Sequence, residues 1–406
     1  RIDGIGVTGQ QHGCQLLGVD RVPCGPFISW QDRRLTEPSN LSSAAPAYLD
    51  VVAELGGARR VGRALPRFEK TGCLIGPKHT AALLFWMLRN GDLPMSACAA
   101  TAPDYLVHCL TGGVHVVDPT NAHGWGVYDV LGHEWNRELI ASLGLPQSIL
   151  PSCADAACIA GGLIASIATD IGLTPGTPVA VASGDHQCSF AGSVANHTQS
   201  VAINIGTGGQ MSVFIEEPME GGSMELRPFI QGGYLLTAGG EVGGRTVRYL
   251  LGFLAQALNI SSTRTRNSFS GRSDDMGVVF ERIVAEADAA GEDAGGVRCV
   301  PLFDGSPGDS AASASFEGLT ATNFTVGNLS RALLNGIARN LYEAYREAVL
   351  FGTGERKILV GSGNGLRLNS VLMRELSRWY GHMPVFGTFT EEAAVGAALC
   401  SAVAIG

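Results

Sequence analysis

The chain has 406 residues, of which 45% are hydrophobic and 16% charged, the composition of a globular protein large enough for more than one domain. A formal net charge of −9, with lysine only at positions 70, 78 and 357, argues against a surface for nucleic acid or an anionic membrane. The ten cysteines include no CxxC spacing, and no signal peptide or long apolar span is evident, so we expect reduced thiols and a cytoplasmic protein.

The chain opens on an apolar segment, residues 2–9, which predicts a strand and leads into Gln10-Gln-His-Gly13. Glycines at positions 4, 6 and 9 have the dinucleotide-binding spacing, but they lie within the strand, so we discount an NAD-dependent oxidoreductase. Gln11 and His12 place an amide and an imidazole at the strand end, where both could hydrogen-bond sugar hydroxyls. On spacing alone, a structural role explains His12 equally well.

An aromatic and charged segment, Ser29-Trp-Gln-Asp-Arg-Arg34, follows a turn-rich link. The indole of Trp30 is a platform on which sugar carbons stack, and Asp32 supplies a carboxylate for the hydroxyls. The alternative is a surface cap in which Trp30 is half-buried. Farther on, residues 77–88 and 104–112 predict helices, and residues 118–129 predict a polar loop that leads into a strand.

The segment around which the chain is organised is Val181-Ala-Ser-Gly-Asp-His-Gln187. Gly184 lets the backbone turn tightly after an apolar strand and leaves the carboxylate of Asp185 at the strand end, where a general base would lie. His186 is a further candidate for substrate contact. An aspartate in this position is more often a turn residue, so the catalytic interpretation of Asp185 depends on the other motifs.

A glycine hairpin opens the second half. Residues 201–205 and 210–215 predict two strands, and the tip between them, Gly206-Thr-Gly-Gly209, offers N–H groups and one hydroxyl for phosphate oxygens. Gly244 precedes a helix expected to begin near Thr246 and could admit an adenosine close to the backbone.

A strand, a second glycine loop and a helix follow later. Residues 328–351 predict a long helix with one buried stripe, and residues 357–360 predict the strand. Gly361-Ser-Gly-Asn-Gly365 forms the loop, and the next helix is expected from Asn369 to Tyr380.

These motifs together resemble those of the FGGY carbohydrate kinases over nearly the whole chain. Gln10-Gln-His-Gly13 is similar to the Gln-Met-His-Gly element of xylulokinases and sedoheptulokinases, with Gln11 where Met is usual. Trp30 begins an element similar to their Trp-(Asn/Gln)-Asp-x-Arg. Asn121-Ala-His-Gly-Trp-Gly126 resembles sedoheptulokinases more than xylulokinases. The resemblance implies an α/β fold of the two-domain actin-like ATPase (ribonuclease H-like) type with an interdomain cleft, a sugar-binding domain at residues 1–194 and a nucleotide-binding domain at 195–406.

The resemblance also implies the reaction, which is ATP-dependent phosphorylation of a ketose, best matched by sedoheptulose, with Mg²⁺ as cofactor and Asp185 as general base. The residues expected to contact the sugar are Gln11, His12, Trp30, Asp32 and His186. The residues expected to contact the nucleotide are Gly206, Thr207, Gly208, Gly244, Gly361, Gly363 and Asn364. The metal ligands stay unidentified.

Other interpretations remain open. A kinase for xylulose, ribulose or a polyol would use the same chemistry, because sugar choice depends on a few pocket side chains. Relatives carry a first hairpin, Asp-x-Gly-Thr-Thr/Ser, that contacts phosphate and supplies an aspartate for Mg²⁺, and this sequence lacks it. We therefore expect an N-terminally truncated chain with little activity of its own, or else a non-catalytic sensor of sugar or nucleotide. A homodimer is a further expectation.

Overall fold

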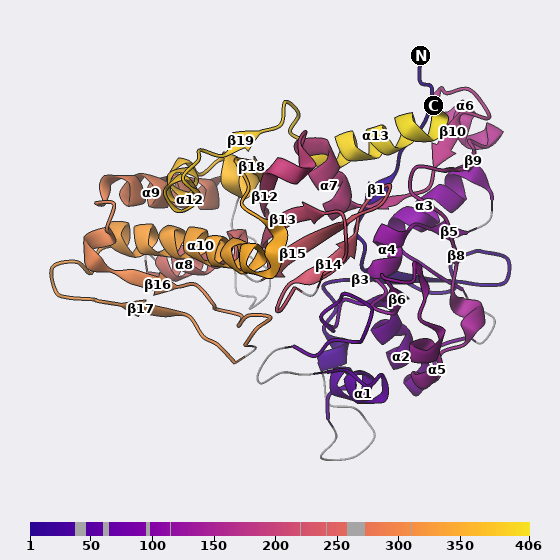
Figure 1. Cartoon of the computed structure of the whole chain (residues 1–406), viewed down its shortest axis with the longest axis horizontal. Coiled ribbons are helices and arrows are strands. Elements are labelled where there is room, and N and C mark those ends of the chain that lie inside the picture. The colour runs from indigo at the N-terminus through magenta and orange to yellow at the C-terminus, as the bar shows by residue number, and fades with distance from the viewer. Residues whose placement is uncertain are drawn as a thin grey trace. The chain divides into compact units, whose positions relative to one another are not determined.

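A computed structural model describes residues 1–36, 46–59, 65–94, 98–113, 115–219, 221–240, 242–257, 273–309 and 311–406 (Figure 1). Contacts between residues divide the chain into two units. Unit 1 comprises Arg1–Ala195, Phe214–Leu236 and Thr388–Gly406, and unit 2 comprises Asn196–Val213 and Thr237–Gly387. The division into domains 1–194 and 195–406 stays a prediction.

Unit 1 is built from short strands and eight helices within the described ranges. The helices are α1 (Tyr48–Leu55), α2 (Thr80–Asn90), α3 (Ala102–Thr111), α4 (Pro119–His123), α5 (Arg137–Ser142), α6 (Ala165–Ile171), α7 (Asp185–Ser193) and α13 (Glu392–Ile405). The strands are β1 (Thr8–Gly9), β2 (Gly13–Leu17), β3 (Ile28–Ser29), β4 (Cys98–Ala100), β5 (Val116–Val117), β6 (Tyr128–Asp129), β7 (Glu134–Trp135), β8 (Ser152–Cys153), β9 (Ile159–Gly162), β10 (Pro178–Ala180), β11 (Ser183–Gly184) and β14 (Glu225–Pro228).

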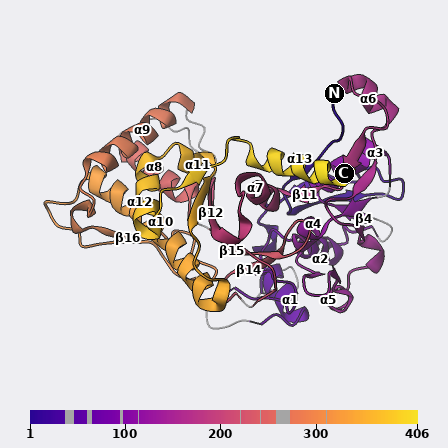
Figure 2. The ribbon, with the colours of Figure 1, turned by 45° about the horizontal axis from the view of Figure 1, so that its top comes forward.

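Helix α13 packs along α7 through very small residues, as Figures 1 and 2 both show. A Cβ atom at Gly396 would lie 2.0 Å from the carbonyl oxygen of Cys188, and one at Gly192 would lie 2.0 Å from that of Glu392. Real side chains do not approach so closely, so glycine at both positions sets the distance between the helices. The alanine- and glycine-rich sequence of α13 is therefore explained by its contact with the helix that begins at Asp185.

Unit 2 contains a sheet whose neighbouring strands are β15 (Tyr234–Gly240), β13 (Gly209–Ile215), β12 (Ser200–Ile205), β18 (Ile358–Ser362) and β19 (Val385–Phe386), in that order. Strands β12 and β13 form the antiparallel hairpin expected from the sequence, while β12 and β18 are parallel. The other elements are α8 (Gly244–Ala257), α9 (Ser273–Ala289), β16 (Arg298–Val300), β17 (Ser315–Glu317), α10 (Val326–Ala348), α11 (Asn364–Arg367) and α12 (Ser370–Tyr380).

Local sequence signals explain three helix ends of unit 2. Thr325 caps α10 by accepting a hydrogen bond from the N–H of Asn328, and Asn369 caps α12 in the same way. Gly381 ends α12 in the left-handed conformation with φ of 75°. The buried stripe predicted for the long helix is confirmed by Leu333, Ile337, Leu341 and Tyr345, which are all buried.

One local prediction is wrong. Residues 118–129 do not begin as a polar loop, because Pro119–His123 form helix α4 with Asp118 as its N-cap. The proline at the first helical position and the side chain of Asp118, which accepts from the N–H of Asn121, stabilise this short helix. Among the helices that the structure describes, none combines the length and the hydropathy needed to cross a bilayer.

Candidate active site

The parallel pair β1 and β11 brings two predicted motifs together in unit 1. Thr8 lies opposite Ser183 and Gly9 opposite Gly184, so both strands end at the same edge. Residues 10–12 leave one strand there, and residues 185–187 leave the other. The side-chain amide of Gln11 joins them by donating to the Oε1 atom of Gln187 at 2.8 Å. Gln11 is only 4% exposed, so its side chain supports the two segments as a buried contact.

Asp185 is the first residue of α7 and its side chain is accessible. Its Oδ1 atom accepts the N–H of His186 at 2.8 Å. Neighbouring protein atoms partly desolvate this accessible carboxylate, and the desolvation raises its pKa. The N–H of His186 and the charge of Arg227 partly offset the increase. A raised pKa makes the carboxylate a stronger base than an ordinary surface aspartate.

Buried polar groups hold the backbone that leads to Asp185. The hydroxyl of Thr120 accepts the N–H of Gly184 at 2.7 Å and donates to Asp118 at 2.7 Å. Asn121 donates to the carbonyl of Ala182 at 3.2 Å. Burial raises the pKa of Asp118 to about 7. The segment predicted as a loop at residue 118 therefore fixes the position of the candidate base.

A buried ion cluster on β14 lies against the site, and the sequence analysis missed it. Arg227 is 4% exposed and donates from Nε and Nη2 to the Oε2 atom of Glu225, at 2.9 and 2.6 Å. Lys78 approaches the other carboxylate oxygen of Glu225 at 3.7 Å. Burial alone would raise the pKa of Glu225, but Lys78 and Arg227 hold it well below its usual range. In the sequence, the signal for this cluster is the pair of charged residues at positions 225 and 227. Side chains two positions apart lie on the same face of a strand.

The Arg227 contact fixes the tautomer of His186. Nη1 of Arg227 lies 3.0 Å from Nδ1 of His186. Because a guanidinium only donates, Nδ1 must accept, and the ring proton is on Nε2. Burial, reinforced by the charge of Arg227, keeps the pKa of His186 well below its usual value. His186 is therefore a neutral ring with its proton on Nε2.

His12 has the opposite arrangement. Its Nδ1 atom lies 3.1 Å from the carbonyl oxygen of Gly124, which only accepts, so Nδ1 carries the proton and Nε2 is a free acceptor site of the ring. Burial, then Lys78 and His79, hold the pKa of His12 well below its usual value. A neutral acceptor imidazole is suited to a hydroxyl that donates to it.

Trp30 and Asp32 differ in their surroundings. Gly13 pairs with Ser29 across the antiparallel strands β2 and β3, so His12, before Gly13, and Trp30, after Ser29, leave the ladder at the same end. Asp32 instead accepts from Nε and Nη2 of Arg34, both at 2.8 Å. The guanidinium of Arg34 in turn lies 4.6 Å from the ring centre of Trp86. The main chain at Trp30 thus leaves the ladder at the same end as that at His12, whereas Asp32 is engaged with Arg34.

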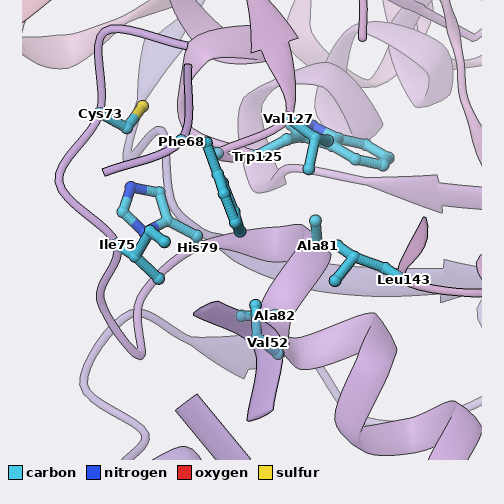
Figure 3. A pocket seen from close by; sticks show the side chains of 11 residues that line it. Val52, Phe68, Cys73, Ile75, His79, Ala81, Ala82, Trp125, Val127 and Leu143 are labelled. Atoms are coloured by element: carbon cyan, nitrogen blue, oxygen red, sulfur yellow. The ribbon is translucent and has the colours of Figure 1, made fainter. Parts of the chain in front are cut away.

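His79 forms a second layer behind His12. The two rings meet edge to face, with centroids 5.2 Å apart. Figure 3 shows His79 beside a small apolar pocket lined also by Phe68, Cys73 and Trp125. The pocket volume is about 10 Å³, which is room for one water molecule and not for a sugar. Burial lowers the pKa of His79 to about 4, so this ring stays neutral.

The glycine hairpin of unit 2 presents backbone groups. Its tip carbonyls are occupied, because Gly206 accepts from the N–H of Gly244 at 3.1 Å and Thr207 accepts from that of Arg245 at 2.7 Å. Within the described residues, no backbone carbonyl accepts from the N–H groups of Thr207 and Gly208. A Cβ atom at Gly244 would lie 2.3 Å from the oxygen of Gly206, so only glycine permits this contact. The tip is thus fixed by its carbonyls and keeps N–H groups for an anion.

The second glycine loop follows β18. Gly361 is buried within the strand, opposite Ile203 and Phe386. Gly363 has φ of 84°, and a Cβ atom there would lie 2.5 Å from the carbonyl oxygen of Ile205. Asn364, at the start of α11, is exposed. Of the three predicted positions, Gly363 and Asn364 are accessible to a ligand, whereas Gly361 is buried between the neighbouring strands β12 and β19.

Histidine, cysteine and carboxylate side chains are the candidates for holding a metal ion. Within the ranges that the structure describes, no group of three His, Cys, Asp or Glu side chains is placed to hold a metal ion. Mg²⁺ in phosphoryl transfer commonly uses only one or two carboxylates together with substrate phosphates. The residues present are therefore compatible with Mg²⁺ that enters bound to a nucleotide.

Solved structures share the fold of the whole chain. A xylulose kinase from Rhodospirillum rubrum superposes with a TM-score of 0.77 at 24% identity, covering 100% of this chain and 76% of that one. A glycerol kinase from Plasmodium falciparum with ADP gives a TM-score of 0.77 at 19% identity, again covering 100% of this chain and 76% of the other. The chain therefore has the two-domain actin-like ATPase fold, and the predicted α/β class is confirmed.

Sequence comparison identifies the family. Residues 1–192 match the model of the N-terminal domain of the FGGY family of carbohydrate kinases. The chain is 26% identical over 425 residues to a sedoheptulokinase of Mus musculus, covering 98% of this chain and 81% of that protein. Residues 1–192 therefore correspond to an FGGY N-terminal domain, and the chain is similar to sugar kinases along nearly its whole length. These similarities support the ATP-dependent sugar kinase that the motifs predicted.

Proposed function

We propose that this kinase transfers the γ-phosphoryl group of ATP to a primary hydroxyl of a ketose, and that the ketose is sedoheptulose, giving sedoheptulose 7-phosphate. The observation that carries the proposal is the accessible carboxylate of Asp185, whose pKa is raised, beside the neutral ring of His186. The sedoheptulokinase of Mus musculus, similar over 98% of the chain, supports this choice of sugar.

Asp185 is the general base of the proposed reaction. It accepts the proton of the attacking hydroxyl, an effect worth about 10²- to 10⁴-fold in rate. Thr120 and Asn121 hold the backbone ahead of it through Gly184 and Ala182. The base therefore moves little before the hydroxyl arrives, which favours an aligned attack.

The two imidazoles orient the sugar. His12 accepts from a sugar hydroxyl through Nε2, and the neutral ring of His186 lies against Arg227 next to Asp185. Trp30 offers an indole face to the carbon skeleton. Gln11 and Asp32 act indirectly, because Gln11 is held by Gln187 and Asp32 by Arg34.

The glycine-rich residues of unit 2 hold ATP. The N–H groups of Thr207 and Gly208 with the hydroxyl of Thr207 bind phosphate oxygens, and Gly244 keeps the helix start close to the tip. Gly363 and Asn364 contact the adenosine. Mg²⁺ bound to the ATP phosphates at this tip would supply neutralisation of their charge.

The decisive experiment measures Mg·ATP-dependent ADP release with sedoheptulose, xylulose, ribulose and glycerol as acceptors. We expect release to be fastest with sedoheptulose and to fall by about 10²- to 10⁴-fold in Asp185→Asn. Asn keeps the shape and the contact with the His186 N–H but is not a base. Release that the mutant retains would reject Asp185 as the base, and a higher kcat/KM with another acceptor would replace sedoheptulose.

A further inference from the structure

Unit 2 contains a second cavity, with a volume of about 290 Å³, at the start of two strands. Val201 and Leu359 line it and lie opposite each other in the parallel pair β12 and β18. The glycine loops lie at the other ends of these strands, four residues farther at Ile205 and Gly363, or about 13 Å at 3.3 Å per residue. The cavity is therefore separate from the residues proposed to hold ATP.

Tyrosine rings form one wall of this cavity. Tyr342 and Tyr345 come from α10 and Tyr380 ends α12, two helices that lie side by side in Figures 1 and 2. Tyr380 meets Tyr342 edge to face at 5.1 Å and stacks on Tyr345 at 5.4 Å. The hydroxyl of Tyr380 donates to Leu341 at 2.9 Å, and that of Tyr345 accepts the N–H of Arg356 at 2.6 Å. These contacts fix the rings before any ligand binds, which reduces the entropy lost on binding.

The charged lining is positive overall. Arg356, Lys357 and His382 face one acidic residue, Glu355. Glu355 is already matched, because Arg346 pairs with it and Tyr345 donates to it at 3.0 Å, and these hydrogen bonds lower its pKa. The ammonium of Lys357 is exposed and forms no ion pair with the residues that the structure describes. An anionic group of a ligand would therefore have a cation available at the rim.

We propose that this cavity binds a monosaccharide phosphate, whose ring packs on Tyr342 and whose phosphate pairs with Lys357. The volume of about 290 Å³ lies at the lower end for ligand sites, near 300 Å³, which suits one sugar ring with one phosphate. Sugar faces stack on aromatic rings, and a dianion is favoured by a cationic lining. The site thus makes the kinase responsive to a product-like compound at a distance from the catalytic residues.

Calorimetric titration tests this proposal. The protein is saturated with a non-hydrolysable ATP analogue and titrated with fructose 6-phosphate, fructose and inorganic phosphate. We expect fructose 6-phosphate to bind at millimolar concentration or below, and Lys357→Gln to weaken this binding about tenfold, the effect of losing one charge-assisted contact. Fructose lacks the phosphate and inorganic phosphate lacks the sugar ring, so each binds more weakly than fructose 6-phosphate.

Matched variants separate this cavity from other sites. Arg298→Gln removes an exposed cation of the same unit that pairs with Glu317, and it leaves binding unchanged. Tyr342→Phe keeps the ring and the affinity, whereas Tyr342→Ala loses both. Asp185→Asn leaves this binding intact, so a failure here is distinct from a failure of the kinase proposal. Absence of fructose 6-phosphate binding at millimolar concentration, or equal binding to Lys357→Gln, overturns the proposal.

Discussion

The residues proposed for the sugar and those proposed for ATP are held in place by different means. In unit 1 several of the proposed site side chains are held by other side chains, as Arg227 holds His186 and Gln187 holds Gln11. In unit 2 the glycine tip is held by main-chain hydrogen bonds to Gly244 and Arg245. A site made from side chains is sensitive to a change of charge, whereas a site made from backbone is sensitive to added volume.

The largest expected effect on stability comes from the buried ion cluster. Glu225→Ala leaves the guanidinium of Arg227, which is 4% exposed, without its carboxylate, and we expect the free energy of unfolding to fall by about 3–5 kcal/mol. Denaturant unfolding measures the change. Glu317→Ala, at the exposed pair with Arg298, is the matched control, with an effect of about 0–1 kcal/mol. Equal effects at both positions would contradict the buried-charge explanation, and Glu225→Ala combined with Arg227→Met should recover most of the loss.

The second effect is a dependence of stability on pH. Burial lowers the pKa of His79 to about 4, so below about pH 6.5 the unfolded chain takes up a proton that folded His79 does not. The unfolding free energy therefore decreases as pH falls from about 6.5 to 4, by about 3 kcal/mol from His79 at 1.36 kcal/mol per pKa unit. The difference between the unfolding free energies at pH 7 and pH 4 should be smaller by about 3 kcal/mol in His79→Gln than in the unsubstituted protein. His382→Gln, at an exposed histidine, is the control, and an unchanged pH dependence in His79→Gln would disprove the assignment.

The third prediction tests whether the glycine tip of unit 2, which is held by backbone contacts, is sensitive to added volume. Gly244→Ala places a Cβ atom 2.3 Å from the oxygen of Gly206, so we expect a loss of about 1–3 kcal/mol in unfolding free energy and a higher KM for ATP. The KM for the sugar should change less. Gly277→Ala is the same substitution in the same unit, at a helical glycine with no atom within 4 Å of the new Cβ, and it should be neutral or stabilising. A normal KM for ATP in Gly244→Ala would remove the hairpin contact from the proposed nucleotide site.

The smallest effect is expected at Asp32. Its carboxylate is engaged with the partly exposed Arg34, so Asp32→Asn should lower the unfolding free energy by less than about 1 kcal/mol. Loss of the charge also loosens Arg34 over Trp86, which should raise the sugar KM only modestly. His12→Gln, assayed in parallel, should raise that KM far more. A larger effect at Asp32 than at His12 would show that Asp32 contacts the sugar directly.

The fold could be predicted well from the sequence wherever the signal was local. The glycine hairpin, the helices expected at residues 328–351 and 369–380, and the apolar strand ahead of Asp185 are all present. Residues 118–123 were misjudged because their polar side chains satisfy one another inside the protein, as Asp118 and Thr120 do. Hydrophobic periodicity carries no information about such buried polar contacts.

The candidate site was predictable only in part, for a related reason. Gln11, His12, Asp185 and His186 follow strand ends, and parallel pairing then brings them together. Glu225 and Arg227 lie about forty residues after Asp185 in a segment with no motif, and only the tertiary fold places them against His186. The tautomers of His12 and His186 depend on such distant partners, so no reading of the sequence could assign them.

The packing of α13 on α7 has a consequence for the order in which the protein matures on the ribosome. Unit 1 is assembled from three stretches, and Thr388–Gly406 is synthesised after all of unit 2. The helix that begins with the candidate base rests on this late segment through Gly192 and Gly396, about two hundred positions apart. A contact of such long range forms slowly. The nascent chain can therefore complete its proposed ATP-binding unit well before Asp185 acquires its final support, which requires Thr388–Gly406.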